Sequence, residues 1–171
     1  VKYDPAFKVN KNSKFPIMML TPHPRFSFHT QGDAKDTFIN DISDHRVRVD
    51  GYDYWVIRIN SRDAEKRKIK NNDLVKVFND QGAVICAAQV TDRIMEGSAH
   101  GYESCAKYDP LGKPGESVDR GGMLNLLTPK KSQIKKAHSM GNSTALVELE
   151  LWDKKELKNI KSQQKILKAA E

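Results

Sequence analysis

The sequence predicts a mainly β fold, an all-β barrel with a few short helices. Short apolar runs of strand length alternate with turn residues along most of the chain, and no long amphipathic helix precedes residue 153. The length of 171 residues, with 38% hydrophobic residues, suits one compact domain with a sizeable core. A closed or nearly closed barrel is the usual way in which so many short strands bury one common core.

The strands are expected at four places outside the hairpin described below. The run FPIMML (15–20) is apolar and ends before Pro22, which disfavours further regular structure. YWVIRIN (54–60) alternates, with Tyr54, Val56, Arg58 and Asn60 on one face and Trp55, Ile57 and Ile59 on the other. Further strands are expected within GSAHGYES (97–104) and ALVELELW (145–152).

A short helix and a hairpin follow the second strand. SRDAEKRKI (61–69) is expected to be helical, with Ser61 as the N-cap and the carboxylates of Asp63 and Glu65 near the positive end of its dipole. The segment 73–94 predicts a β-hairpin, because Asn79 to Gly82 supply residues that tolerate a tight turn between two apolar runs.

The net charge of +7 is unevenly distributed. Much of it lies in KKSQIKKAH (130–138) and in the C-terminal segment 153–171, which is expected to be a basic helix or tail. Such a balance suggests an anionic partner, and a stand-alone basic β-barrel that binds nucleic acid is the alternative function. The lysine-rich segments lack the interleaved aromatic residues on which bases stack, so no nucleic-acid partner is expected.

Other classes of protein find little support in the sequence. No apolar run approaches the roughly 20 residues that cross a bilayer, and no membrane association is expected. With two cysteines, Cys86 and Cys105, buried free thiols are more probable than a disulfide scaffold. No GxGxxG, P-loop, HExxH or CxxC motif occurs, and a metal site built on His23 and His29 would need further ligands from elsewhere. We therefore expect neither catalytic nor metal-ligating residues in this chain, and the cytoplasm is the default compartment.

Three polar loops, each at the edge of an apolar strand, predict a preformed ligand site. The first is TPHPRFSFHTQ (21–31), which two prolines stiffen before any ligand arrives. The second, GGMLNLLTP (121–129), pairs two glycines with Asn125, and the third, MGNST (140–144), contains Asn142. Guanidinium, imidazole, hydroxyl and amide groups together suit a phosphate or a polar heterocycle.

Six segments in order resemble the C-terminal, molybdopterin-dinucleotide-binding domain of the dimethyl sulfoxide reductase family. They are LTPHPRFSFHTQ, INSRDAEKRKIKNNDLVKVFNDQGAV, VTDRIMEGSAHGYES, YDP, GGMLNLLTP and GNSTALVELE. The resemblance covers about residues 16–152. HPRFSFHTQ and HGYES…YDP look most like the branch of the family that transfers hydroxyl groups between polyhydroxybenzenes, and the dimethyl sulfoxide reductases are next.

The resemblance implies a double-psi six-stranded β-barrel and a ligand, molybdopterin guanine dinucleotide. Two copies of this cofactor would hold molybdenum or tungsten in the intact enzyme. The positions that match the family's cofactor contacts are His23, Arg25, His29, Thr30, Gln31, Tyr102, Glu103, Asn125 and Asn142. Ser61 departs from the family, which often has proline there.

The resemblance also implies what lies elsewhere. The metal ligand and the substrate pocket would belong to other domains of the same enzyme, so the isolated domain is expected to be inactive and without bound cofactor. Residues 1–15 would be a linker from a preceding domain, and an iron–sulfur electron-transfer subunit would be a further partner. A barrel enzyme of the aspartate-decarboxylase type would need a self-processing Gly-Ser pair, which Gly97-Ser98 supplies, but the flanking sequence follows the reductase family.

Overall fold

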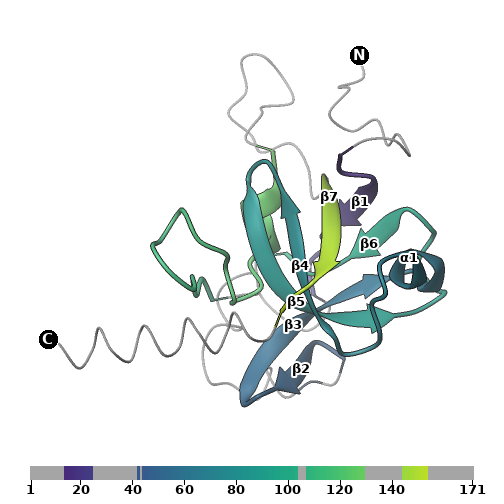
Figure 1. Cartoon of the computed structure of the whole chain (residues 1–171), viewed down its shortest axis with the longest axis horizontal. Coiled ribbons are helices and arrows are strands. Elements are labelled where there is room, and N and C mark those ends of the chain that lie inside the picture. The colour runs from purple at the N-terminus through teal and green to yellow at the C-terminus, as the bar shows by residue number, and fades with distance from the viewer. Residues whose placement is uncertain (1–13, 25–41, 43, 104–106, 130–143, 154–171) are drawn as a thin grey trace, which may run out of the picture.

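The computed structural model describes residues 14–24, 42, 44–103, 107–129 and 144–153 (Figure 1). Within these residues, two short helices accompany the strands: α1 (Ser61–Lys66) and the 3-10 helix η4 (Leu124–Leu127). The strands are β1 (Ile17–Leu20), β2 (Arg46–Val49), β3 (Tyr52–Ile59), β4 (Leu74–Asn79), β5 (Gly82–Val90), β6 (Ser98–His100) and β7 (Thr144–Leu151).

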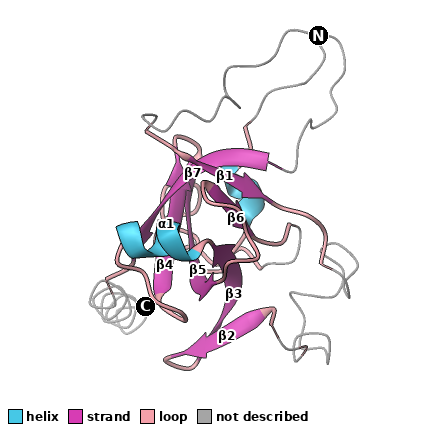
Figure 2. Cartoon of the chain, turned by 90° about the vertical axis from the view of Figure 1, so that its right-hand side faces the viewer, coloured by secondary structure: helices cyan, strands magenta, loops and turns pink. Residues whose placement is uncertain are grey.

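Six of these strands close into a barrel. Their order is β3-β5-β4-β7-β1-β6, and β6 pairs back onto β3, so that the described barrel strands leave no free edge. The pairs β1–β6 and β3–β5 are parallel, whereas the remaining barrel pairs are antiparallel. This is the double-psi six-stranded barrel that the resemblance implies. β2 pairs with β3 alone and lies beside the barrel at one end of the molecule (Figure 2).

The barrel interior is filled by branched aliphatic side chains. Ile57 and Ile59 of β3, Val75 and Val77 of β4 and Val147 of β7 all belong to one buried cluster. A strand sends alternate side chains to opposite faces, so the cluster takes every second residue from each strand. A second cluster, centred on Tyr54 and Ile85, covers the outside of β3 and β5, which explains why β3 is buried on both faces from Tyr54 to Ile57.

Most of the expected elements are confirmed. The hairpin turns between Asn79 and Gly82, where the Asn79 side-chain oxygen accepts a hydrogen bond from the backbone N–H of Gln81. One expectation is wrong: the N-cap of α1 is Asn60, not Ser61. The Asn60 side chain accepts from the N–H of Arg62, whereas the Ser61 hydroxyl donates to Asp92. Cys86 is fully buried, as expected, and burial raises the pKa of its thiol. Cys105 lies outside the described residues.

The segment 107–123 is tied to the barrel by one buried carboxylate. Oδ1 of Asp119 accepts from the backbone N–H groups of Asp109 and Gly121, and Oδ2 accepts from the N–H of Met123. The backbone of Asp119 pairs with β5 through Ala83 and Ile85. This arrangement fixes the route of the chain into η4. No helix in the described part of the chain is long and apolar enough to cross a membrane.

Candidate functional site

The candidate site lies where the parallel strands β1 and β6 end side by side. Leu20 is in register with His100, and beyond this point the Gly101 N–H donates to the Leu20 carbonyl at 3.0 Å. The Glu103 N–H continues the contact by donating to the Pro22 carbonyl at 3.2 Å. Parallel strands bring their carboxyl ends to one edge, so the segments 21–23 and 101–103 run together at the end of the barrel.

His23 and Glu103 meet across these two segments. The His23 Nε2 lies 2.9 Å from Oε1 of Glu103, and the side chains are 55% and 17% exposed, respectively. The carboxylate is therefore largely enclosed while the imidazole remains open to solvent. Because Pro22 and Pro24 flank His23, its backbone has little freedom and the pair is held in place before a ligand arrives.

Tyr102 is enclosed by cationic and aromatic side chains. Its ring centroid lies 5.1 Å from that of His45 and 5.1 Å from that of His100, each in an edge-on arrangement. The Arg58 guanidinium carbon lies 5.2 Å from the same ring centroid, and Trp55 packs against Tyr102 as well. Contacts of this kind fix the orientation of the tyrosine.

Arg58 and His100 form a pair beside Tyr102. Nη1 of Arg58 lies 3.2 Å from Nδ1 of His100, and Nη2 donates to the Asp44 carbonyl at 2.9 Å. A guanidinium can only donate, so Nδ1 of His100 accepts and the proton of the neutral ring is on Nε2. Burial, and then the charge of Arg58, lower the pKa of His100. The residue therefore presents a neutral N–H donor.

Gly101 allows η4 to approach this edge of the barrel. A Cβ at position 101 would lie 2.1 Å from Cδ1 of Leu124, so any larger residue would displace that side chain. Asn125 is the next residue of η4 and is half-buried. The helix that carries Asn125 is thus brought against the end of β6, next to Tyr102.

The structure places some of the expected site residues and not others. It brings His23, Tyr102 and Glu103 to one edge and places the helix of Asn125 against that edge. The other expected contacts lie outside the described residues: Arg25, His29, Thr30, Gln31 and Asn142. His29 of the His23–His29 metal pair lies outside the described residues as well. Among the described residues, no group of three or more His, Cys, Asp or Glu could hold a metal ion.

Arg58, His45 and His100 were not expected in the site. The sequence offered one signal for His100, which directly precedes Gly101 and Tyr102 at a strand end. Arg58 appeared only as a polar residue on one face of a strand, and its pairing with β6 brings it to Tyr102. This pairing joins residues that are 42 positions apart, and local sequence carries no information about it.

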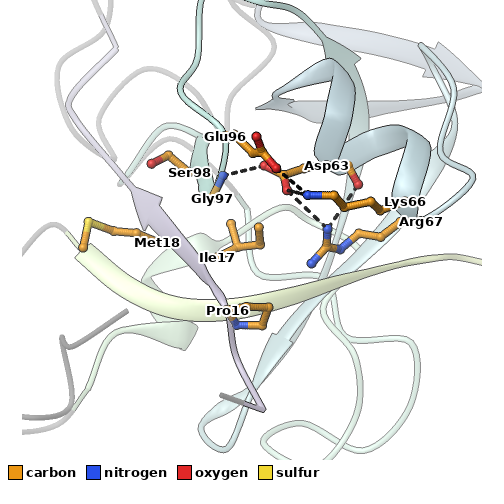
Figure 3. Close-up of a pocket in the computed structure, with 9 residues that line it drawn as sticks. All are labelled: Pro16, Ile17, Met18, Asp63, Lys66, Arg67, Glu96, Gly97 and Ser98. Atoms are coloured by element: carbon orange, nitrogen blue, oxygen red, sulfur yellow. Dashed lines mark hydrogen bonds and ion pairs between the residues drawn. The ribbon is translucent and has the colours of Figure 1, made fainter. Parts of the chain in front are cut away.

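A pocket of about 480 Å³ lies near the start of β1 (Figure 3). Asp63 and Lys66 of α1 and Arg67, which follows the helix, point into it together with Glu96, and Figure 3 shows these charges directed toward one another. The buried Asp63 carboxylate accepts from the Gly97 N–H at 2.6 Å. Lys66 pairs with Glu96, and Arg67 binds Glu148 at 2.6 Å. Because these charged groups pair with one another and with Glu148, we interpret the pocket as part of the structural contact between α1 and the turn before β6.

The hydrogen-bonding groups at the β1–β6 edge fit a polar heterocycle. A carboxylate such as that of Glu103 accepts paired N–H groups, which are present on the pyrimidine edges of pterin and guanine. The exposed imidazole of His23 and the amide of Asn125 add groups that bind ring atoms or phosphate oxygens. The site is preformed, since the His23–Glu103 pair and the packing of Tyr102 exist in the protein alone.

Comparison with known proteins gives a family match. The model of the molydopterin dinucleotide binding domain family matches residues 17–145. The chain is 57% identical over 155 residues to the pyrogallol hydroxytransferase large subunit of Pelobacter acidigallici, covering 88% of this chain and 18% of that protein. It is 30% identical over 146 residues to trimethylamine-N-oxide reductase of Haemophilus influenzae, covering 84% of this chain and 17% of the relative.

Two further similarities agree with this match. The dimethyl sulfoxide/trimethylamine N-oxide reductase of Cereibacter sphaeroides is 31% identical over 139 residues, covering 81% of this chain and 16% of the relative. Among solved structures, acetylene hydratase from Pelobacter acetylenicus superposes with a TM-score of 0.57 at 11% identity, covering 81% of this chain and 18% of that one, which shows a common fold. The chain spans less than a fifth of the length of these relatives.

Proposed function

Because the chain belongs to the molydopterin dinucleotide binding domain family, we propose that residues 16–152 are the C-terminal domain of a larger molybdenum enzyme. In this proposal the domain binds two molybdopterin guanine dinucleotides and covers the active site. Residues 1–15 would be the linker from a preceding domain, and residues 153–171 a basic C-terminal helix or tail. The observation that carries the proposal is the His23–Glu103 pair at the carboxyl ends of β1 and β6, within the matched residues.

The four described residues that match the family's contact positions each have a proposed role. Glu103 accepts hydrogen bonds from the amine and ring N–H groups of a pterin or guanine edge. His23, fixed by Glu103 through Nε2, presents its ring to a phosphate or ring oxygen. The ring of Tyr102, held by its neighbours, forms one side of the site, and Asn125 supplies a side-chain amide from η4. Arg25, His29, Thr30, Gln31 and Asn142 are proposed as further contacts because they match the family positions.

The cofactor would supply a metal centre, molybdenum or tungsten, held by dithiolene sulfurs and able to change oxidation state. The residues of this chain would orient the cofactor and exclude water from one side of it. The metal ligand from the protein and the substrate pocket would lie on the remaining domains, which are the first proposed partners.

Transfer of a hydroxyl group between polyhydroxybenzenes is the proposed activity of the whole enzyme. The identity of 57% to a pyrogallol hydroxytransferase supports it over oxygen-atom transfer, since the N-oxide and sulfoxide reductases named above are 30% and 31% identical. The name of the first relative refers to a large subunit, which supports a further subunit in the whole enzyme. We propose an iron–sulfur electron-transfer subunit as this second partner.

The test is to produce the whole polypeptide encoded by the gene in a host that makes the cofactor. The purified protein is analysed for metal and for guanine nucleotide released by acid. One molybdenum or tungsten and two guanine nucleotides per polypeptide are expected, together with hydroxyl transfer to pyrogallol. A folded protein that lacks both metal and nucleotide would overturn the proposal; a protein that contains them but reduces sulfoxides would overturn the proposed activity alone.

A further inference from the structure

A second, smaller polar pocket lies on the outside of the barrel, away from the buried cluster. It has a volume of about 350 Å³ and is formed by the carboxyl ends of β3 and β5 with two neighbouring loops. Arg58 is in register with Gln89, and both alternate with core residues, so their side chains face outward. The polar residues that line the pocket are Asp44, Arg58, Asn71, Gln89, Thr91 and Arg93.

Gln89 carries an unsatisfied group in this pocket. Its side-chain oxygen is buried from solvent and has no hydrogen-bond partner. A buried carbonyl without a donor is costly, and native structures contain few of them. A ligand that brings a donor to this oxygen would remove that cost.

The cations of the pocket differ in how far they are engaged. Arg58 is held in place by His100, by the Asp44 carbonyl and by the ring of Tyr102. The guanidinium of Arg93 has neither a hydrogen-bond nor an ion-pair partner among the described residues, although its backbone N–H donates to Thr91. Arg93 thus offers all of its side-chain donors to a ligand.

The charge of the pocket lining and its hydrogen-bond donors together indicate the chemical class of the ligand. The lining contains two guanidinium groups and one carboxylate, that of Asp44, so it has a net positive charge. The Asn71 oxygen is already used by the N–H of Val90, which leaves the amide nitrogen of Asn71 as an additional donor. An anion would bind to the donors, and a hydroxyl or N–H group on the same molecule would satisfy Gln89.

We propose that this pocket binds a small organic anion, a phosphate or carboxylate that also bears a hydroxyl or amino group. Arg93 binds the anionic group as its main partner, Arg58 provides a fixed positive charge, and Gln89 accepts from the hydroxyl or amino group. The proposal goes beyond the proposed function: the lining includes none of the residues proposed to contact the cofactor, although Arg58 also lies against Tyr102.

The experiment uses the whole polypeptide with its cofactor bound, so that the cofactor site is not available to the probe. Isothermal titration calorimetry at low ionic strength compares glycerol 3-phosphate with inorganic phosphate. We expect saturable binding of both, with glycerol 3-phosphate the tighter. Arg93→Gln should weaken both about tenfold, the usual effect of losing one charge-assisted contact.

Two variants separate specific binding from the general effect of charge. Gln89→Leu should abolish the preference for glycerol 3-phosphate while the affinity for inorganic phosphate stays the same, because only the acceptor is lost. The control Arg48→Gln removes an equally positive and likewise exposed side chain on β2, outside the pocket, and should change neither affinity. Equal weakening by Arg48→Gln and Arg93→Gln would overturn the proposal.

Another source of the same chemistry is an acidic side chain from another domain. In that case neither probe would bind the whole polypeptide, and Arg93→Gln would lower its thermal unfolding temperature while Arg48→Gln would not. That result would also overturn the proposal of a free small anion.

Discussion

The imidazole of His23 and the carboxylate of Glu103 lie 2.9 Å apart and join the two segments that leave the parallel strands β1 and β6. The barrel strands β3, β4, β5 and β6 lie between these two residues in the sequence. The pair also sets the geometry of the candidate site, because the enclosed carboxylate fixes an imidazole that is exposed to a ligand. The first prediction concerns this carboxylate.

Replacing Glu103 should reduce cofactor retention. Glu103→Gln keeps the shape of the side chain but presents an amide to N–H groups of the ligand and weakens the hold on His23. We expect the whole polypeptide to retain about one-tenth of the guanine nucleotide of the wild type after gel filtration, from the 10- to 100-fold effects typical of such positioning residues. The control is Glu116→Gln, an exposed carboxylate paired with Lys113, which should retain the full content. Equal retention by both variants would contradict the proposed role.

His100 should titrate below its ordinary pKa of 6.5. Burial and Arg58 disfavour the protonated ring, so the unfolded chain binds this proton more readily than the folded one. The contribution of His100 to stability is therefore present above pH 6.5 and is lost as the pH falls through the folded pKa. NMR titration of the imidazole measures this pKa directly. In Arg58→Gln the pKa should rise toward the ordinary value, and no change would show that the two side chains do not interact.

The free energy of unfolding should be especially sensitive to a small change at Asp119. Both of its carboxylate oxygens accept backbone N–H groups in a fully buried position. In Asp119→Asn one oxygen becomes an amide N–H₂ that faces a donor, and we expect a loss of about 2–3 kcal/mol in the free energy of unfolding. Urea unfolding measures the loss. The matched control is Asp80→Asn, which alters an exposed ion pair with Lys14 and should change stability by less than ~0.5 kcal/mol.

Two glycines should respond differently to the same added methyl group. A Cβ at Gly121 would lie 1.6 Å from the carbonyl oxygen of Lys107, which is backbone and cannot rotate away. Gly121→Ala should therefore displace the segment around Asp119 and cost about 3 kcal/mol or more. At Gly82 nothing lies within 4 Å of the added carbon, so Gly82→Ala should stay within ~1 kcal/mol of the wild type. Similar urea midpoints for the two variants would show that the backbone contact at Gly121 is absent in solution.

Local patterns were sufficient for most of the strands. The apolar runs that became β1, β3 and β7 and the turn residues between β4 and β5 each carry their own signal, because strand burial and turn geometry depend on neighbouring residues. β2 was missed since its sequence, RVRV, has the composition of an edge strand and is defined by its pairing with Tyr52 to Trp55. Ser61 was a reasonable N-cap by residue type, but Asn60 holds the non-helical backbone that a cap requires.

Only part of the candidate site could be predicted from the sequence, for a physical reason. His23, Tyr102 and Glu103 were singled out by their resemblance to the family and by their positions at strand ends. That His23 and Glu103 touch depends on the parallel register of β1 and β6, in which Leu20 faces His100. Arg58 and the external pocket depend on β3 lying between β5 and β6. Such neighbours are set by closure of the whole barrel.

The sequence by itself determined that this protein is built from short strands and that its polar loops follow those strands, because residue type and spacing act over a few positions. Its resemblance to cofactor-binding domains rests on six segments that match a known family in order. Only the tertiary structure decided which strand ends meet, that Asn60 caps α1, that Asp119 holds three backbone N–H groups, and that Gln89 is left without a donor. Each of these depends on contacts between distant residues, which form when the barrel closes and buries its polar groups together with its core.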